Sequence, residues 1–230
     1  MVINTPGKNT NSAAELTMGL LLSAFRKIVP AHQSMQSLNW DRHRFNGGEL
    51  MNKCLGIIGL GNVGHRVARY AKAFDMKLQA FDPYLADEVF ERHGVQKVDW
   101  ITLLNTSDVI TFHVPLNDET RGMISEMEIE RMKPGVILLN TARGGVIDET
   151  SLLNTLHSGH VAAAGIDTWE VEPPRDNPFS QLPQVVMSPH IGASTSEAQI
   201  RIAESIATQV PRALRLSLIH ISEPTRQPNI

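Results

Sequence analysis

The chain has 230 residues, of which 42% are hydrophobic and 20% are charged, and it carries a formal net charge of −3. This composition is ordinary for a soluble globular protein that is long enough to bury a sizeable core. The negative charge argues against a nucleic-acid partner, and the single cysteine, Cys54, excludes an internal disulfide and fits a reducing cytoplasm. Polar residues 1–12 predict no signal peptide, and the apolar stretch 16–25 is too short to span a membrane. We therefore expect a cytoplasmic protein with no membrane partner.

A helix is predicted near the start of the chain. Ser12 and Glu15 have the spacing of a capping box, and a stripe of apolar residues at helical spacing follows them. We expect this stripe to lie in the core or in a subunit interface. Pro30 is expected to kink or end the helix, and the polar residues 39–49 predict a connecting loop. The stripe consists of Leu16, Leu20 and Ala24.

From residue 53 onward, short apolar runs alternate with helical segments such as 63–74 and 151–156. Short apolar strands that alternate with helices indicate a parallel sheet covered on both faces. We therefore predict an α/β fold with a doubly wound parallel sheet, a Rossmann-type domain over residues 53–193. The predicted strands are 54–58, 78–81, 109–112, 136–139, 161–166 and 185–187.

A last helix is predicted to open at Ser194, with Glu197 three residues later, and Pro211 should disturb its final turn. Residues 216–226 resemble the translated read-through of a sequencing adapter. Four segments are therefore expected. They are a crossover helix and loop left from a substrate-domain junction (1–52), a nucleotide-binding domain (53–193), a return helix (194–214) and a non-native tail (215–230).

A glycine cluster follows the first predicted strand and opens a helix, which is the context of a dinucleotide-binding fingerprint. Gly59 permits a tight turn, Gly61 lets backbone amides approach a pyrophosphate, and Gly64 lets the helix and strand pack closely. The helix amino terminus would donate N–H groups to the phosphates. The alternative is a glycine-rich turn that holds no ligand.

An acidic residue, Asp82, ends the second predicted strand, about 20 residues beyond the glycines. Its carboxylate can accept hydrogen bonds from the ribose hydroxyls of NAD and would repel the 2′-phosphate of NADP. The next residues, Pro83 and Tyr84, provide no arginine to offset that repulsion. The sequence therefore favours NAD as the cofactor.

Three chemically distinctive side chains follow later strands, and ligands of open α/β sheets bind beyond the carboxyl ends of the strands. Arg143 can grip a carboxylate with two hydrogen bonds, and His190 can take a hydroxyl proton. Glu172 beside it would stabilise the protonated imidazole. Spacing alone does not establish this convergence, and by itself it favours surface or cap roles for Arg143 and Glu172.

Two histidines and the single cysteine are expected to have structural rather than chemical roles. His157 and His160 have the look of a metal pair, but Gly159 should end a helix between them and no second pair of ligands is evident. We therefore interpret 157–160 as a loop and predict no metal site. Cys54 has no marked basic neighbour and is expected to serve packing.

Four motifs in order resemble the D-2-hydroxyacid dehydrogenases, namely 59–64, 141–145, 167–173 and 188–190. The similarity covers roughly residues 3–214. The resemblance implies an enzyme with catalytic Arg143, Glu172 and His190, and with Asp167 near the nicotinamide carboxamide. It implies a cofactor site built from Gly59, Gly61, Asn62, Val63, Gly64, Asp82, His113, Val114, Pro115, Thr141, Ala142, Asp167 and Gly192.

Within that family, residues 189–199 and 4–15 are similar to stretches typical of 3-phosphoglycerate dehydrogenases. Trp169 departs from the usual phenylalanine and is expected to pack as a bulkier aromatic. The family also carries an amino-terminal substrate domain of roughly a hundred residues, most of which we expect to be missing here. The resemblance further implies a homodimer.

The resulting hypothesis is hydride transfer from a small-molecule D-2-hydroxyacid, 3-phospho-D-glycerate, to NAD in serine synthesis. A rival within the class is another acid, such as glycerate, hydroxypyruvate or D-lactate. A different class is a non-catalytic NAD-sensing scaffold, because corepressors that resemble this family keep similar active-site residues. A third possibility is a fragment that folds and binds NAD but is inactive alone.

Overall fold

The computed structural model describes the backbone of residues 5 and 7–222, and side chains as far as residue 212. Seven parallel strands form one sheet with the order β3-β2-β1-β4-β5-β6-β7. Strand order runs outward in both directions from β1 and β4, so the predicted doubly wound sheet is confirmed. The strands are β1 (Cys54–Ile58), β2 (Lys77–Phe81), β3 (Gln96–Lys97), β4 (Val109–Phe112), β5 (Val136–Asn140), β6 (Val161–Ile166) and β7 (Val185–Met187).

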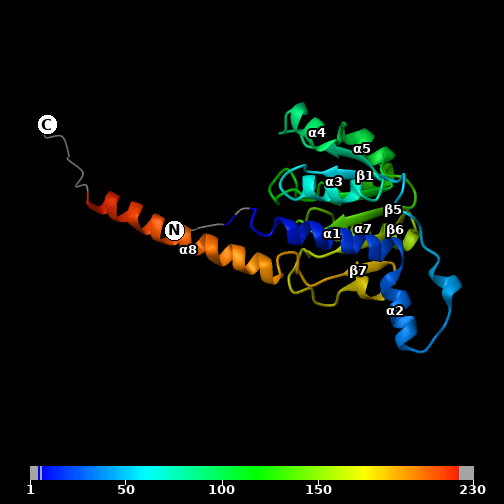
Figure 1. The fold of residues 1–230 in the computed structure, drawn as a ribbon. Coiled ribbons are helices and arrows are strands. Elements are labelled where there is room, and N and C mark those ends of the chain that lie inside the picture. The colour runs from blue at the N-terminus through cyan, green and yellow to red at the C-terminus, as the bar shows by residue number, and fades with distance from the viewer. Residues whose placement is uncertain (1–4, 6, 223–230) are drawn as a thin grey trace.

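Helices cover both faces of this sheet (Figure 1). One layer contains α1, which packs on β5, β6 and β7, and α3, which packs on β1 and β2. The other contains α5, α6 and α7, which contact one another in sequence. The helices are α1 (Thr10–Phe25), α2 (Ile28–Gln36), α3 (Gly64–Lys72), α4 (Asp87–His93), α5 (Trp100–Thr106), α6 (Glu126–Arg131), α7 (Glu149–Ser158) and α8 (Ser196–Ser222), with 3₁₀ turns η1 (Arg42–Phe45) and η2 (Pro178–Gln181).

Two apolar cores result, one under each helix layer. In β4, Val109 belongs to one core and Ile110 to the other, and both are fully buried. A strand buried on both faces needs an unbroken apolar run, which is why the central strands were visible in the sequence. On α1, Leu20 and Ala24 are buried against the sheet, so the apolar stripe of that helix lies in the core.

The first helix begins earlier than predicted. Its first residue is Thr10, whose hydroxyl donates to the carbonyl of Gly7 at 2.9 Å. Ser12 lies inside the helix, and its hydroxyl pairs with that of Thr195 at 2.7 Å. The predicted capping box of Ser12 and Glu15 is therefore wrong, because the serine oxygen is used in a contact between distant segments.

Pro30 does not end the first helix. The break comes at Lys27, which adopts a left-handed backbone with φ 52° between α1 and α2. Pro30 lies in the first turn of α2, where a backbone N–H would have no helical partner, so the proline costs no hydrogen bond there. The predicted loop 39–49 is irregular apart from η1.

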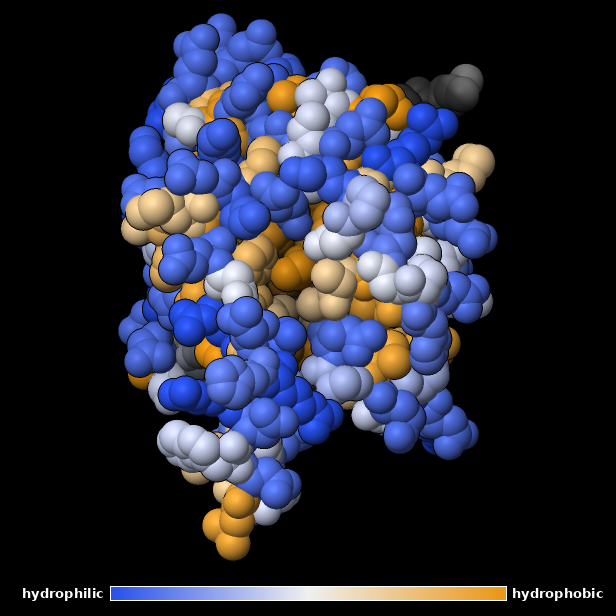
Figure 2. Space-filling model, turned by 90° about the vertical axis from the view of Figure 1, so that its right-hand side faces the viewer, coloured by the Kyte–Doolittle hydropathy of each residue, from blue (hydrophilic) through white to orange (hydrophobic). Residues whose placement is uncertain are grey.

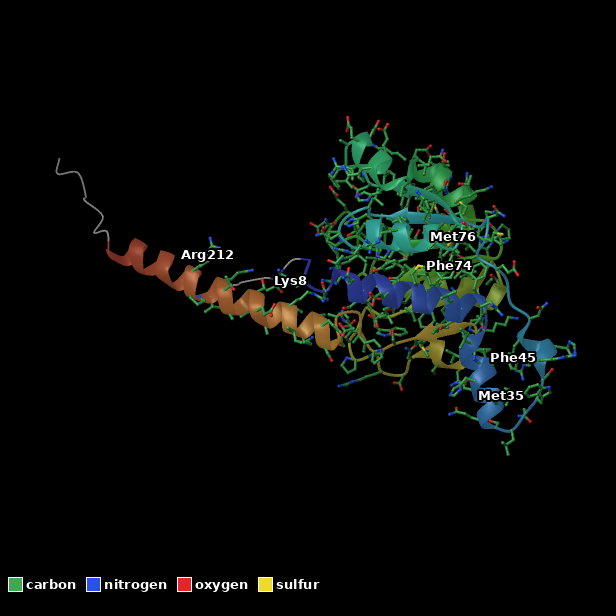
Figure 3. The ribbon with its side chains drawn as sticks, viewed as in Figure 1. Lys8, Met35, Phe45, Phe74, Met76 and Arg212 are labelled. Atoms are coloured by element: carbon green, nitrogen blue, oxygen red, sulfur yellow. The ribbon has the colours of Figure 1, made fainter. Side chains whose placement is uncertain are left out.

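The long helix α8 also differs from its prediction at both ends. Thr195, not Ser194, caps it, since its hydroxyl accepts the N–H of Ala198 at 3.2 Å. The helix continues through Pro211, because the carbonyl that a proline leaves unpaired, that of Ala207, is on an exposed residue that water can reach. Residues 215–222 of the predicted non-native tail extend its backbone, and 223–230 lie outside the described residues. Figure 3 places Arg212 on this helix, at the opposite end of the molecule from Met35 and Phe45.

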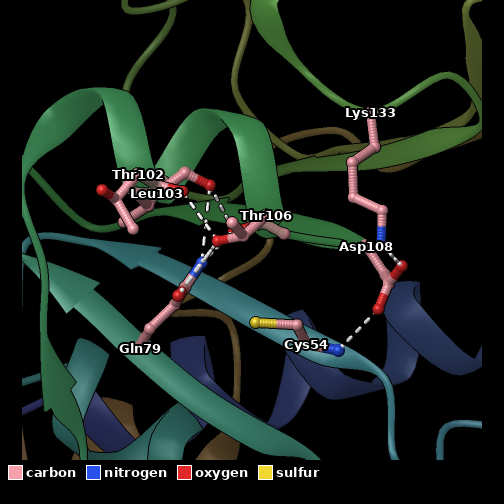
Figure 4. Close-up of polar contacts among 8 residues, drawn as sticks. Cys54, Gln79, Thr102, Leu103, Thr106, Asp108 and Lys133 are labelled. Carbon is pink, nitrogen blue, oxygen red and sulfur yellow. Dashed lines mark hydrogen bonds and ion pairs between the residues drawn. The ribbon is translucent and has the colours of Figure 1, made fainter.

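Figure 4 shows two separate sets of polar contacts, one around Asp108 at the amino-terminal ends of the strands and one around Gln79 of β2. Asp108 accepts the backbone N–H of Cys54 at 2.7 Å and the ammonium of Lys133 at 2.5 Å. The buried side chain of Gln79 donates to the hydroxyl of Thr106 at 2.8 Å. Burial, followed by the charge of Asp108, raises the pKa of Cys54, so its thiol stays protonated near neutral pH.

A cavity of about 600 Å³ opens at the same end, between the end of α1 and the loop that carries η1. Figure 2 views the molecule from that side and shows a hollow with apolar residues on its floor. Phe25, Phe45 and Ile137 line this cavity together with Lys27 and Lys53. No helix of the described residues is long and apolar enough to cross a membrane.

Candidate functional site

The glycine turn between β1 and α3 is shaped by close backbone approaches. A Cβ on Gly64 would come within 2.1 Å of the carbonyl oxygen of Gly59, so no side chain fits there. Gly59 itself has φ +89°, and a Cβ on it would meet the carbonyl of His113 at 2.8 Å. A Cβ on Gly61 would meet nothing within 4 Å, so the space over the turn is open. A tight turn with open space at a helix amino terminus fits a dinucleotide pyrophosphate.

Asp82 connects the end of β2 to this turn. One carboxylate oxygen accepts the N–H of Leu60 at 3.0 Å, and the other accepts the N–H of Tyr84 at 3.1 Å. Each carboxylate oxygen can accept a further hydrogen bond. The carboxylate is therefore fixed in place beside the glycine turn and still able to accept ribose hydroxyls.

A second pocket, of about 240 Å³, lies at the carboxyl ends of β4, β5 and β6. It brings together most of the predicted residues that follow these strands, and it also includes Asn9, Ala13 and Ala193, which were not predicted as site residues. Glu172, Asp82, Asn62 and the glycines of the turn do not line it. The predicted residues that line it are Val63, His113, Val114, Pro115, Thr141, Ala142, Arg143, Asp167, His190 and Gly192.

His113 lies in the wall of the pocket at the end of β4. Burial lowers the pKa of His113 to about 3, so the imidazole is neutral throughout the physiological range. Its Nε2 lies 3.0 Å from the hydroxyl of Thr111. A neutral, hydrogen-bonded ring adds shape and polarity to the pocket without adding charge.

Glu172 and His190 form a hydrogen-bonded pair, with Oε2 and Nδ1 2.8 Å apart. The other carboxylate oxygen of Glu172 accepts the N–H of Trp169 at 3.1 Å. Partial burial tends to raise the pKa of Glu172. Hydrogen bonds from His190 and Trp169, together with the charges of His190 and Arg143, outweigh that effect and hold the pKa below its usual value. Glu172 is therefore ionised, and it orients the imidazole from behind while His190 lines the pocket.

The loop that carries His190 is held by a buried carboxylate. Asp167 is fully buried at the end of β6 and accepts the N–H groups of Ile191 and Gly192 at 2.8 and 2.9 Å, as well as the hydroxyl of Ser188. His190 has φ 53°, a left-handed conformation that a non-glycine residue adopts only when its surroundings impose it. The three hydrogen bonds to Asp167 supply that constraint. Both oxygens of Asp167 therefore hold the His190 loop in place, in addition to the predicted contact of this carboxylate with the cofactor.

The turn that carries Arg143 is held in place by Asn140, the last residue of β5. The side chain of Asn140 accepts the N–H of Ala142 at 3.1 Å and donates to the carbonyl of Arg143 at 2.9 Å. Arg143 is exposed, lines the pocket and is near enough to lower the pKa of Glu172 by its charge. A guanidinium in this place can hold an anionic substrate group.

Trp169 does more than the packing that we predicted. It is buried against Phe179, and its indole N–H donates to the carbonyl of Ser188 at 3.2 Å. A phenylalanine could not make this hydrogen bond to the segment that leads into His190.

The two histidines near the end of α7, His157 and His160, lie on either side of the residue that ends this helix. Gly159 ends the helix with φ 80°, as predicted, but His157 and Ser158 belong to the last helical turn, so the prediction of a loop over 157–160 was wrong for these two residues. In the described residues, no group of three or more His, Cys, Asp and Glu side chains is arranged to hold a metal ion.

Comparison with known proteins agrees with this geometry. The sequence profile of the D-isomer specific 2-hydroxyacid dehydrogenase NAD binding domain matches residues 18–192. The chain therefore belongs to the D-2-hydroxyacid dehydrogenase family, and the matched region is its NAD-binding domain.

Among its relatives, D-3-phosphoglycerate dehydrogenase of Archaeoglobus fulgidus is 48% identical over 211 residues, which are 91% of this chain and 40% of that protein. Hydroxypyruvate reductase of Thermotoga maritima is 45% identical over 93% of this chain and 70% of its own length. The crystal structure of D-lactate dehydrogenase from Aquifex aeolicus, complexed with NAD and lactic acid, superposes with a TM-score of 0.86 at 29% identity. That match covers 98% of this chain and 73% of that one. The chain spans about 40% of the length of the phosphoglycerate dehydrogenases that it matches.

Proposed function

We propose that the protein to which this chain belongs is an NAD-dependent dehydrogenase of D-2-hydroxyacids. The observation that carries the proposal is the 2.8 Å pair between Glu172 and His190, because it fixes the protonation pattern of the ring. An ionised carboxylate can only accept, so Nδ1 of His190 donates to Glu172, and in the neutral ring Nε2 is then the nitrogen whose lone pair can act as a base. Arg143 holds the substrate carboxylate, and His190 Nε2 takes the hydroxyl proton.

The proposed reaction breaks two bonds and forms one. The O–H and C–H bonds of the alcohol carbon break and a carbonyl forms, with the proton passing to His190. NAD held at the glycine turn would supply the acceptor for the hydride that leaves the same carbon. The resulting imidazolium is stabilised by Glu172, and Arg143 keeps the carbon in one orientation.

The variant His190→Asn tests this role in the complete protein. Asparagine tolerates the left-handed backbone of position 190, so the loop should keep its shape. We expect turnover to fall by about 10²–10⁴-fold with NADH affinity unchanged. His157→Asn, on the far helix α7, is the matched control. A His190→Asn protein that keeps its biological role without turnover would favour the NAD-sensing scaffold, and undiminished turnover would refute the catalytic role.

For the substrate we propose 3-phospho-D-glycerate, which would place the enzyme in serine synthesis. The supporting observation is the 48% identity to a D-3-phosphoglycerate dehydrogenase. Hydroxypyruvate is the competing substrate, supported by the 45% identity to a hydroxypyruvate reductase. Comparing kcat/KM of the complete protein for phosphoglycerate, glycerate and D-lactate decides between them, and a preference for either of the last two would refute the narrower assignment. We further propose that the complete protein is a homodimer in the cytoplasm. Its molar mass, measured by light scattering, would test the dimer.

For the cofactor, we propose a preference for NADH over NADPH that depends on Asp82. The fixed carboxylate beside the glycine turn would repel a 2′-phosphate. Fluorescence titration of the chain with both cofactors tests this preference. Equal affinities would refute the role of Asp82, and no saturable binding of either would refute an independently functional nucleotide site.

A further inference from the structure

A buried threonine on α1 touches the candidate nicotinamide pocket from behind. Thr17 is fully buried in the middle of α1, although threonine is a polar residue. Its hydroxyl oxygen lies 2.8 Å from the carbonyl of Ala13, one turn earlier, and also 2.8 Å from the hydroxyl of Thr141. Thr141 follows β5 and lines the pocket. The two hydroxyls are therefore the polar link between α1 and the pocket wall.

Counting protons fixes the direction of these hydrogen bonds. A hydroxyl has one proton to donate, whereas a carbonyl oxygen can only accept. The proton of Thr17 must therefore go to Ala13, and the bond between the two threonines must use the proton of Thr141. The hydroxyl of Thr141 thus points its proton toward α1, and only an oxygen lone pair remains for other partners.

The backbone carbonyl of Thr141 is likewise available as a hydrogen-bond acceptor. Within the part of the chain that the structure describes, no backbone N–H donates to the carbonyl oxygen of Thr141. Any ligand group in the pocket that hydrogen-bonds to an oxygen of Thr141 therefore has to be a donor. A primary amide N–H₂ requires such acceptors, and a methyl group or an anion does not.

We propose that Thr17 is a positioning residue for the cofactor. By holding the hydroxyl proton of Thr141, it keeps Thr141 as an acceptor for the carboxamide N–H₂ of nicotinamide. The inference rests on the proposed location of the nicotinamide in this pocket. Without Thr17, the Thr141 hydroxyl is free to rotate and direct its own proton at the amide.

The test compares two cofactors that differ at the carboxamide, NAD and 3-acetylpyridine adenine dinucleotide, in which a methyl group replaces the NH₂. Calorimetric titration of the 230-residue chain is the readout. We expect Thr17→Val, which keeps the shape and loses the hydroxyl, to bind NAD about fivefold more weakly, the loss typical of one neutral hydrogen bond. We expect it to bind the acetylpyridine analogue as the unchanged chain does.

Two controls separate this effect from a general loss of structure. Thr17→Ser restores the hydroxyl and should restore NAD affinity. Thr155→Val removes a similar buried hydroxyl that also bonds one turn back, to the carbonyl of Ser151 at 2.8 Å, but on α7 and outside the pocket lining. It should change neither affinity. Equal weakening of both cofactors in Thr17→Val, or no weakening of either, would overturn the inference.

The unchanged chain supplies a test that does not depend on any variant folding. It should prefer NAD over the acetylpyridine analogue by about fivefold. Equal binding of the two would overturn the role of Thr17 while leaving the cofactor site intact. Failure to bind either would instead refute the nicotinamide site and the inference with it.

Discussion

The contact between Gly144 and the Trp169 loop provides the sharpest test of how the site is held together. A Cβ on Gly144 would lie 1.8 Å from the carbonyl oxygen of Trp169 and 2.5 Å from the backbone nitrogen of Glu170. Real contacts of a Cβ atom begin near 3.0 Å, so in Gly144→Ala the Trp169 peptide has to retreat by about 1.2 Å. That peptide leads directly into Glu172.

The obstacle is backbone, which cannot swing aside as a flexible side chain can. We therefore expect Gly144→Ala to destabilise the fold by about 3 kcal/mol, the upper end of the overpacking range. If the complete protein has the proposed activity, a displacement of about 1 Å at the Glu172–His190 pair should lower its kcat by about 10²-fold. Urea unfolding followed by circular dichroism measures the first effect, and steady-state kinetics measure the second.

Gly19→Ala is the matched control, because its Cβ meets nothing within 4 Å on the exposed face of α1. That variant should stabilise the chain by about 0.5–1 kcal/mol through its helix propensity. If Gly144→Ala unfolds at the same urea concentration as the unchanged chain, the close approach described here does not exist in solution.

Three further outcomes follow from other contacts. Gly61→Ala should leave the unfolding midpoint unchanged and weaken NADH binding, because its Cβ enters open space over the turn, whereas Gly64→Ala should lower the midpoint. Burial, followed by the charges of nearby carboxylates, raises the pKa of Glu149. The folded state therefore keeps a proton that the unfolded state releases, and the free energy of unfolding falls as pH rises above about 4.5. Glu149→Gln should therefore stabilise the chain at pH 7 but not at pH 4, in urea titrations at both values. Asp108→Ala should cost about 1–3 kcal/mol because it leaves the Cys54 N–H without its partner, and the exposed control Asp87→Ala should cost about 0–1 kcal/mol.

The strands and the glycine turn could be predicted from the sequence because their signals are local. Buried parallel strands such as β4 and β5 need continuous apolar residues, and the turn at Gly59 needs glycine for steric reasons that hold in any such fold. The two-residue strand β3 was not predicted, because it is an exposed edge strand without an apolar pattern.

Helix boundaries were predicted less well because distant residues decide them. Ser12 looks like a cap until Thr195 takes its hydroxyl, and Ser194 looks like a cap until Thr195 takes that role as well. Neither competition is visible in a window of neighbouring residues. The same limit explains why Asn9 and Ala13 were not foreseen in the pocket, since only the packing of α1 across the sheet brings them there.

The meeting of Glu172 with His190 has a different status. Their positions after β6 and β7 predicted one edge of the sheet, but not a contact. The contact depends on two irregular loops that are held by Asp167 and Trp169. Only the family resemblance supplied it in advance, and the catalytic roles of the pair stay predictions for the experiments above.

The three loops at the carboxyl ends of β5, β6 and β7 brace one another through backbone groups: Gly144 abuts the Trp169 peptide, Trp169 bonds Ser188, and Asp167 holds Ile191. Substitutions in different loops should therefore show strong epistasis. Double-mutant cycles across them are expected to deviate from additivity by about 0.5–3 kcal/mol, whereas cycles with Asp108 at the other end of the sheet should add. Changing the substrate range of this site would then require coordinated replacements in several loops, and libraries that vary one loop at a time would miss most functional combinations.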